Sequence, residues 1–226
     1  MPESQQAAFG DPVPVLDKGA IQLLNMMGSD QEIIAAARVS TGTRAGADLQ
    51  RDRDLIFFLA EHRHGTPFEH VVFQFYVRCP IFVARQWMRH RIASYNEASA
   101  RYRVLKDEFY VPDRSALPDF ITDEDIAEYQ RVLEHAHQFY LRMIEKAKPH
   151  PQQRSRVREV FRGVIGTAIY TEFYWSVNLR SLWNFLELRT APGAQYEIRQ
   201  YAQALDNMVQ QVVPIAYEAL KRFGRA

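Results

Sequence analysis

The sequence predicts an α+β fold, a single domain in which a mixed or antiparallel sheet packs against long helices. Short β-branched and aromatic runs at Val71 to Val77 and Tyr170 to Val177 are typical of strands, whereas Thr122 to Lys146 carries a long helical pattern. Strands and helices do not alternate regularly, and the chain has no Gly-x-Gly-x-x-Gly motif. A Rossmann domain is therefore not expected.

Composition places the chain among ordinary globular proteins. It has 226 residues, of which 47% are hydrophobic and 24% charged, so we expect one domain over 13–226 and a flexible polar tail at 1–12. A net charge of +1 provides no global field that attracts nucleic acid. The sequence shows no signal-peptide pattern and no apolar run of roughly 18 residues, so the expected location is the cytoplasm, with no membrane partner.

The N-terminal part of the domain predicts a pair of strands and then a helix. Val13 to Met27 contains two apolar runs, separated by the turn-like triplet Asp17 to Gly19, which indicates two strands. Ser29, with a glutamate three residues later, predicts the start of a helix that runs towards Val39. Two glycines indicate a loop at 41–47.

The remaining elements follow from helix signals and helix breakers. Pro80 suits the first turn of a helix that ends near Arg89. Three acidic residues after Thr122 favour the start of the long helix there, because they complement its dipole. An extended segment is expected at 102–111 and a loop at 112–122. Four further segments have helical periodicity: 51–62, 152–169, 179–190 and 195–223.

Residues 89–103 hold the most informative pattern, because they carry four arginines and a single acid, Glu97. A guanidinium group presents a planar fork of donors that fits the oxygens of a phosphate or carboxylate. Ser94, Asn96 and Ser99 are interleaved with the arginines and add directional hydrogen bonding, which a solvated basic loop would not need. The segment therefore predicts a site for an anionic ligand.

The same segment has the pattern R-H-R-x-x-S-x-N-E-x-S-x-R-Y, which resembles the signature of the flavin-dependent thymidylate synthases. Four further segments resemble blocks of that family in the family's order: Ala36 to Ser40, His64 to His70, Pro80 to Trp87 and Asn178 to Leu186. The resemblance implies reductive methylation of dUMP to dTMP, with 5,10-methylenetetrahydrofolate as carbon donor and NADPH-reduced FAD as hydride source. It also implies a homotetramer whose active sites are shared between subunits.

The resemblance also assigns residues to two binding sites. Those expected to bind dUMP are Gln86, Trp87, Met88, Arg89, Glu97, Ala98, Ser99, Ala100, Arg101, Arg162 and Arg189. Those expected to contact FAD are His64, Thr66, Arg89, His90, Arg91, Glu97, Asn178, Leu179, Arg180 and Asn184. Arg180 and Asn184 are four residues apart, so one helical face would present both to a single ligand.

The resemblance gives Arg189 the catalytic role, beside N3 and O4 of the uracil. A fixed cation there lowers the free energy of charge that develops on the ring. The resemblance further implies that Arg101 holds the nucleotide phosphate and that Arg162 reaches a nucleotide held by another subunit. We expect Ser99 to bind the nucleotide rather than attack it, because the sequence pairs no base with its hydroxyl.

Two positions depart from the family pattern. Ala100 stands where relatives often have glycine, and its Cβ would resist a positive φ. No histidine lies near Gly193, so no histidine role is expected there.

Cys79, the only cysteine, precedes a proline at the end of a predicted strand and is expected to be a buried small hydrophobe. Thymidylate formation would then proceed without an enzyme thiolate.

Other functions remain open at this point. The arginines and aromatic residues of segment 85–103 could bind nucleic acid through phosphate contacts and base stacking, although the neutral net charge disfavours this. A flavoprotein without catalytic activity is a second alternative, which the complete set of motif arginines disfavours. His62, His64, His70 and His90 have weak spacing for zinc and no supporting cysteine pair, so no metal is expected.

Overall fold

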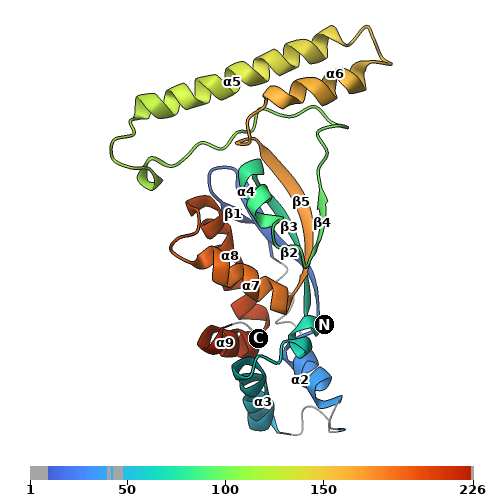
Figure 1. Cartoon of the computed structure of the whole chain (residues 1–226), viewed down its shortest axis with the longest axis vertical. Helices are drawn as coiled ribbons and strands as arrows, with labels where there is room; N and C mark the ends of the chain where they lie inside the picture. Colours follow the sequence, from blue (N-terminus) through green and yellow to red (C-terminus); the bar gives the residue numbers. More distant parts are fainter. Residues whose placement is uncertain (1–9, 40–41, 43–47, 225–226) are drawn as a thin grey trace.

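The computed structural model describes residues 10–39, 42 and 48–224. Its centre is a five-stranded sheet of order β1-β2-β3-β5-β4, in which all neighbouring strands are antiparallel. Figure 1 shows helices packed beside and below this sheet, and a helical arm that projects across its upper end. This architecture confirms the predicted α+β class. Among the described residues, no helix is both long and apolar enough to cross a membrane.

The two central strands supply most of the sheet's buried surface. The five strands are β1 (Val13–Val15), β2 (Gly19–Met27), β3 (Val72–Pro80), β4 (Ser94–Glu97) and β5 (Tyr170–Asn178). β3 and β5 pair along their whole length, and alternate side chains of both point into the core. Phe75 and Trp175 face each other across this ladder with ring centroids 5.6 Å apart. Both strands, predicted from their β-branched and aromatic residues, are confirmed, and their buried positions alternate along the chain.

Helices cover one face of the sheet and its lower end. They are α2 (Asp30–Arg38), α3 (Leu49–Glu61), α4 (Ile81–Trp87), α7 (Leu179–Thr190), α8 (Tyr196–Val212) and α9 (Pro214–Phe223). Trp87, Phe185 and Tyr201 are fully buried: Trp87 and Phe185 pack against Trp175 of β5, and Tyr201 packs against Trp87 and donates a hydrogen bond to the Arg78 carbonyl of β3. Because these large rings fix α4, α7 and α8 to the sheet, the ends of α4 and α7 have defined positions.

The predicted start of α2 is confirmed. The Ser29 hydroxyl accepts a hydrogen bond from the Gln31 N–H at 3.2 Å and therefore caps the helix. The two predicted strands around the Asp17 turn are also confirmed. The predicted tail lies mostly in residues 1–9 and the predicted loop mostly in 40–41 and 43–47, which are outside the described residues.

The arm consists of α5 (Asp123–Lys146) and α6 (Arg154–Phe161), followed by a short 3-10 turn, η4 (Arg162–Val164). α5 begins at a capping box between Thr122 and Asp125, where each residue's side chain bonds the other's backbone N–H. A small second core, formed by Phe109, Leu133, Ala168 and Ile169, attaches the arm to the sheet.

Four predictions about individual helices and strands were wrong. The expected helix over 152–169 ends at Phe161, because a 3-10 turn at 162–164 and a second turn at 167–168 follow, and Ile169 bridges Phe109. The expected helix over 195–223 is two helices, since Pro214 lacks the N–H that would continue α8. The extended segment expected at 102–111 pairs only at Phe109 within the described ladders. The motif segment 89–103, for which no strand was predicted, contains β4, which pairs with β5.

Candidate active site

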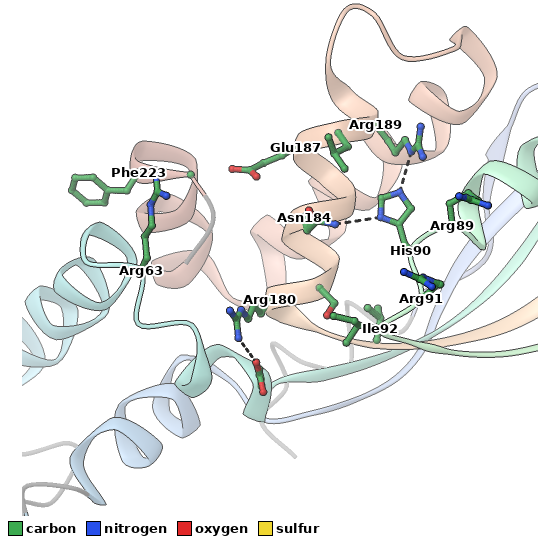
Figure 2. Close-up of a pocket in the computed structure, with 15 residues that line it drawn as sticks. Arg63, Arg89, His90, Arg91, Ile92, Arg180, Asn184, Glu187, Arg189 and Phe223 are labelled. Carbon is green, nitrogen blue, oxygen red and sulfur yellow. Dashed lines mark hydrogen bonds and ion pairs between the residues drawn. The ribbon is translucent and has the colours of Figure 1, made fainter.

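A broad cleft of about 930 Å³ opens along the length of α7 (Figure 2). Its walls come from the turn after α4, from α7, from the end of α9 and from the turn after α3. Five arginines line it, namely Arg63, Arg89, Arg91, Arg180 and Arg189, against two acids, Glu69 and Glu187. This size lies at the upper end of the range of about 300–1,000 Å³ for small-molecule sites. The excess of guanidinium groups suits a large ligand with several negative charges.

Arg89 and Arg91 reach the cleft because Trp87, two residues before Arg89, is anchored in the core. Trp87 ends α4 and its ring lies 4.7 Å from that of Phe185, measured between centroids. The chain then turns, and the Tyr95 hydroxyl donates a hydrogen bond of 2.8 Å to the His90 carbonyl. Within the described residues, neither Arg89 nor Arg91 has an acidic partner. Their charges are therefore available to an anion.

His90 lies between two residues of α7. The Arg189 Nε–H donates a hydrogen bond to His90 Nε2 at 3.1 Å, and the Asn184 amide lies 3.4 Å from His90 Nδ1. Figure 2 shows both interactions across the floor of the cleft. A guanidinium group can only donate, so Nε2 must carry a lone pair and the ring proton must be on Nδ1. The Asn184 amide nitrogen faces Nδ1 in the structure, so accepting that proton requires the amide group to be turned round.

The same contacts keep His90 neutral. Burial, and secondly the charge of Arg189, lower the pKa of His90 to about 4. A neutral imidazole can accept from Arg189 at physiological pH, whereas an imidazolium would repel it. Arg189 is thus held by a neutral partner and keeps its full positive charge for a ligand.

Arg180 is fixed by a second set of contacts. Its guanidinium forms an ion pair of 2.5 Å with Glu69, which lies in the 3-10 turn η2 (Thr66–His70). The side chain passes directly over Gly65, where an added Cβ would lie 2.6 Å from Arg180 Nε. The Arg180 side chain can therefore occupy this position only because Gly65 has no side chain.

Six of the residues expected from the resemblance line the cleft together: Arg89, His90, Arg91, Arg180, Asn184 and Arg189. Four polar lining residues were missed: Arg63, Glu69, Ser181 and Glu187. Glu69 and Ser181 lie within segments that resemble the family, and this was an available signal. Arg63 stands between His62, considered only as a possible metal ligand, and His64, expected to contact FAD, and no motif position fell on Arg63 itself.

A second group of expected residues lies on and after β4, outside the cleft: Glu97, Ala98, Ser99, Ala100 and Arg101. The Glu97 carboxylate accepts a hydrogen bond of 2.7 Å from the Thr171 hydroxyl of β5. Arg101 forms an ion pair of 3.1 Å with Glu159 on α6, and Arg162 follows on η4. These residues gather near the base of the arm, so one subunit does not bring them to Arg189.

The other expected residues take different positions. Trp87 and Leu179 have fully buried side chains, so only their backbone atoms can reach a ligand. Gln86 hydrogen-bonds Gln195, and Met88 is half-buried at the end of α4. The Asn178 side chain caps α7 by accepting from the Ser181 N–H at 2.9 Å. Two more expected residues, His64 and Thr66, are exposed on the turn that carries Gly65.

Sequence comparison identifies relatives along almost the whole chain. The family model described as "Thymidylate synthase complementing protein" matches residues 22–215. A flavin-dependent thymidylate synthase of Thermotoga neapolitana is 44% identical over 214 residues, covering 94% of this chain and 95% of the relative. A second, from Thermosipho africanus, is 43% identical over 223 residues and covers 93% and 94% of the two chains.

Structure comparison agrees with the sequence comparison. The crystal structure of a UMP/dUMP methylase from Streptomyces cacaoi, bound with 5-bromo-dUMP, matches with a TM-score of 0.82 and 33% identity. The match covers 95% of this chain and 99% of that one. These similarities extend over both the arginine-lined cleft and the arm. The chain belongs to the flavin-dependent thymidylate synthase family.

Proposed function

We propose that this protein methylates dUMP to dTMP, with FAD bound in the arginine-lined cleft. The observation that supports this most strongly is the convergence of Arg89, Arg91, Arg180 and Arg189 on one cleft in a chain of this family. NADPH-reduced FAD supplies the hydride, and 5,10-methylenetetrahydrofolate supplies the carbon unit, so the folate leaves as tetrahydrofolate.

The residues of the cleft fit this cofactor. Arg89 and Arg91 have no acidic partner in the part of the chain that the structure describes, and Arg180 offers a third guanidinium group that Glu69 neutralises only in part. Such forks match the oxygens of the flavin's diphosphate. Asn184 would add a directional hydrogen bond from the same face of α7 as Arg180.

Arg189 is the residue we assign to the reaction itself. Methylation at C5 is easier when negative charge spreads over N3 and O4 of the uracil, and a fixed cation lowers the free energy of that charge. His90 holds the Arg189 guanidinium through Nε2 without competing for charge, because its imidazole is neutral. Arg189 therefore stays preorganised before the nucleotide arrives.

The position of Cys79 supports a route without an enzyme thiolate. Cys79 is fully buried in β3, and burial raises the pKa of its thiol well above the usual range. It does not line the cleft. The nucleotide would thus be activated by polarisation from Arg189 rather than by a covalent bond to sulfur.

We also propose that the active site is shared between subunits of a homotetramer. The expected dUMP residues at 97–101 and Arg162 lie near the arm, and within one subunit they do not line the cleft. A neighbouring subunit could bring its own arm-side group to the cleft and complete the site. Cytoplasmic location, the absence of nucleic-acid and membrane partners, and the preference for NADPH remain predictions of the sequence.

UMP is a second candidate substrate. The matched structure from Streptomyces cacaoi is named as a UMP/dUMP methylase and has also been solved with 5-bromo-UMP, in a form with a TM-score of 0.77 to this chain. The two nucleotides differ only at the 2′ position of the ribose, where UMP has a hydroxyl.

Absorption spectroscopy and product analysis test the proposed function. The purified protein should show flavin bands, which should bleach when NADPH is added without oxygen, and faster when dUMP is present. With methylenetetrahydrofolate added, dTMP should form from dUMP, and parallel reactions with UMP show which nucleotide is used. A colourless protein that cannot be reconstituted with FAD would exclude the proposal and return attention to nucleic-acid binding by segment 85–103.

A further inference from the structure

Arg63 occupies a backbone position that normally selects glycine. Its φ is +57°, in the left-handed region. At the end of α3, the His64 N–H bonds the Leu59 carbonyl at 2.8 Å and the Arg63 N–H bonds the Ala60 carbonyl at 3.2 Å. These two bonds form a Schellman motif with Arg63 at its left-handed residue. The turn itself gains nothing from an arginine there, and glycine would adopt it with less strain.

The Arg63 side chain is exposed and lines the cleft. Figure 2 shows it at the end of the cleft near Phe223, with Arg180 between it and the His90–Arg189 pair. Within the described part of the chain, its guanidinium has no hydrogen-bond or ion-pair partner. The two acids of the cleft have other partners, since Glu69 pairs with Arg180 and Glu187 accepts from the Trp183 indole.

Arg63 and Arg180 line the same end of the cleft. The Arg180 side chain lies over Gly65, which is only two residues after Arg63. Glu69 pairs with Arg180, and Glu187 also lies at this end, since a Cβ added at Gly224 would be 3.1 Å from its Oε1. The cleft as a whole still carries five arginines against these two acids, so its net charge is positive.

We propose that Arg63, together with Arg180, forms a phosphate-binding subsite at the α3 end of the cleft, which takes a phosphate group of a bound dinucleotide. The assignment rests on the proposed function. Two dinucleotides could supply the group, because FAD carries a diphosphate and NADPH carries both a diphosphate and a 2′-phosphate. Guanidinium forks suit phosphate oxygens, and the Arg63 side chain lines the cleft without an ion-pair partner among the described residues.

Arg63→Gly separates this role from a structural one. Glycine suits the left-handed φ, so the variant should unfold at the same temperature as the native protein or a higher one. If the side chain binds phosphate, the variant should bind FAD about tenfold more weakly, as expected for loss of one charge-assisted hydrogen bond. Riboflavin, which has no phosphate, should bind both proteins equally. Arg63→Lys, which keeps a charge at the same backbone position, should recover part of the affinity.

Flavin fluorescence titrations of flavin-free protein give these dissociation constants, and flavin reduction rates with NADPH and NADH test the second source. Weaker binding of FAD but not of riboflavin assigns the subsite to the flavin diphosphate. Unchanged FAD binding with a lost preference for NADPH over NADH assigns it to the 2′-phosphate. No change in either, or equal weakening for FAD and riboflavin, would overturn the subsite. Failure of the native protein to bind FAD would instead contradict the proposed function.

Discussion

Replacing Gly65 with alanine should separate ligand binding from stability. The added Cβ would lie 2.6 Å from Arg180 Nε and 2.8 Å from its Cζ, so the guanidinium group must move away from its present position. The backbone at Gly65 has φ −73° and ψ −26°, which alanine adopts without strain. The variant therefore displaces one side chain of the cleft without distorting the turn.

The expected change in stability is small because two effects oppose each other. Gly→Ala at a compatible position stabilises by about 0.4–1 kcal/mol through the unfolded chain. Loss of the exposed Arg180–Glu69 pair costs about 0.2–1 kcal/mol. The free energy of unfolding should thus change by less than about 1 kcal/mol, which is a Tm shift of at most about 4 °C for a chain of this length. FAD affinity should fall about tenfold, since Arg180 no longer lies where the anion binds.

Calorimetry and flavin fluorescence titration measure the two quantities on the same samples. Gly193→Ala is the matched control, because an added Cβ there meets nothing within 4 Å. Glu69→Gln removes the ion pair while leaving Gly65 free. Native FAD affinity in Gly65→Ala would refute the assigned role of Arg180, and a Tm drop well above 4 °C would show that the turn does not tolerate the side chain.

Three further changes test other parts of the account. Arg189→Ala should lower turnover by about 10²–10³-fold while FAD stays largely bound; loss of flavin with normal turnover would contradict its catalytic role. His90 should make the folded state acid-sensitive: below the unfolded pKa of about 6.5 only the unfolded chain takes up the proton, until the folded pKa of about 4 is reached. Stability should therefore fall as pH drops between these values, and denaturant titrations of His90→Gln at pH 7 and 5 should show a smaller fall than the native protein. Asp30→Ala should lower Tm by about 4–8 °C, a loss of about 2 kcal/mol, because the buried carboxylate accepts the Ile215 and Ala216 N–H groups at the start of α9; an unchanged Tm would exclude this cap.

The central strands and most helices could be predicted because their local pattern matches their burial. β3 and β5 alternate apolar and polar residues, and one face of each is buried. β4 could not be predicted in the same way, because an edge strand of four largely polar residues buries little surface. The break between α8 and α9 leaves the apolar periodicity intact, so only Pro214 marks it.

The candidate site could be predicted only where a continuous motif carries it. The 89–103 segment named Arg89, His90 and Arg91, but it could not show that Trp87 points into the core while its neighbours face the cleft. Contacts between distant segments leave no local pattern. Glu69 and Arg180 are 111 positions apart in the sequence. That Gly65 leaves room for the Arg180 side chain can be seen only in the three-dimensional structure.

The central claim is that this chain makes dTMP by a flavin-dependent route that needs no enzyme thiolate. The most direct measurement is dTMP formation from dUMP, methylenetetrahydrofolate and NADPH, with protein stripped of flavin, then with FAD restored, and then after exposure of the folded protein to a thiol-alkylating reagent. We predict no product without FAD, product when FAD is restored, and undiminished product after alkylation, because Cys79 is fully buried. Product formed without flavin, or abolished by alkylation, would contradict the account.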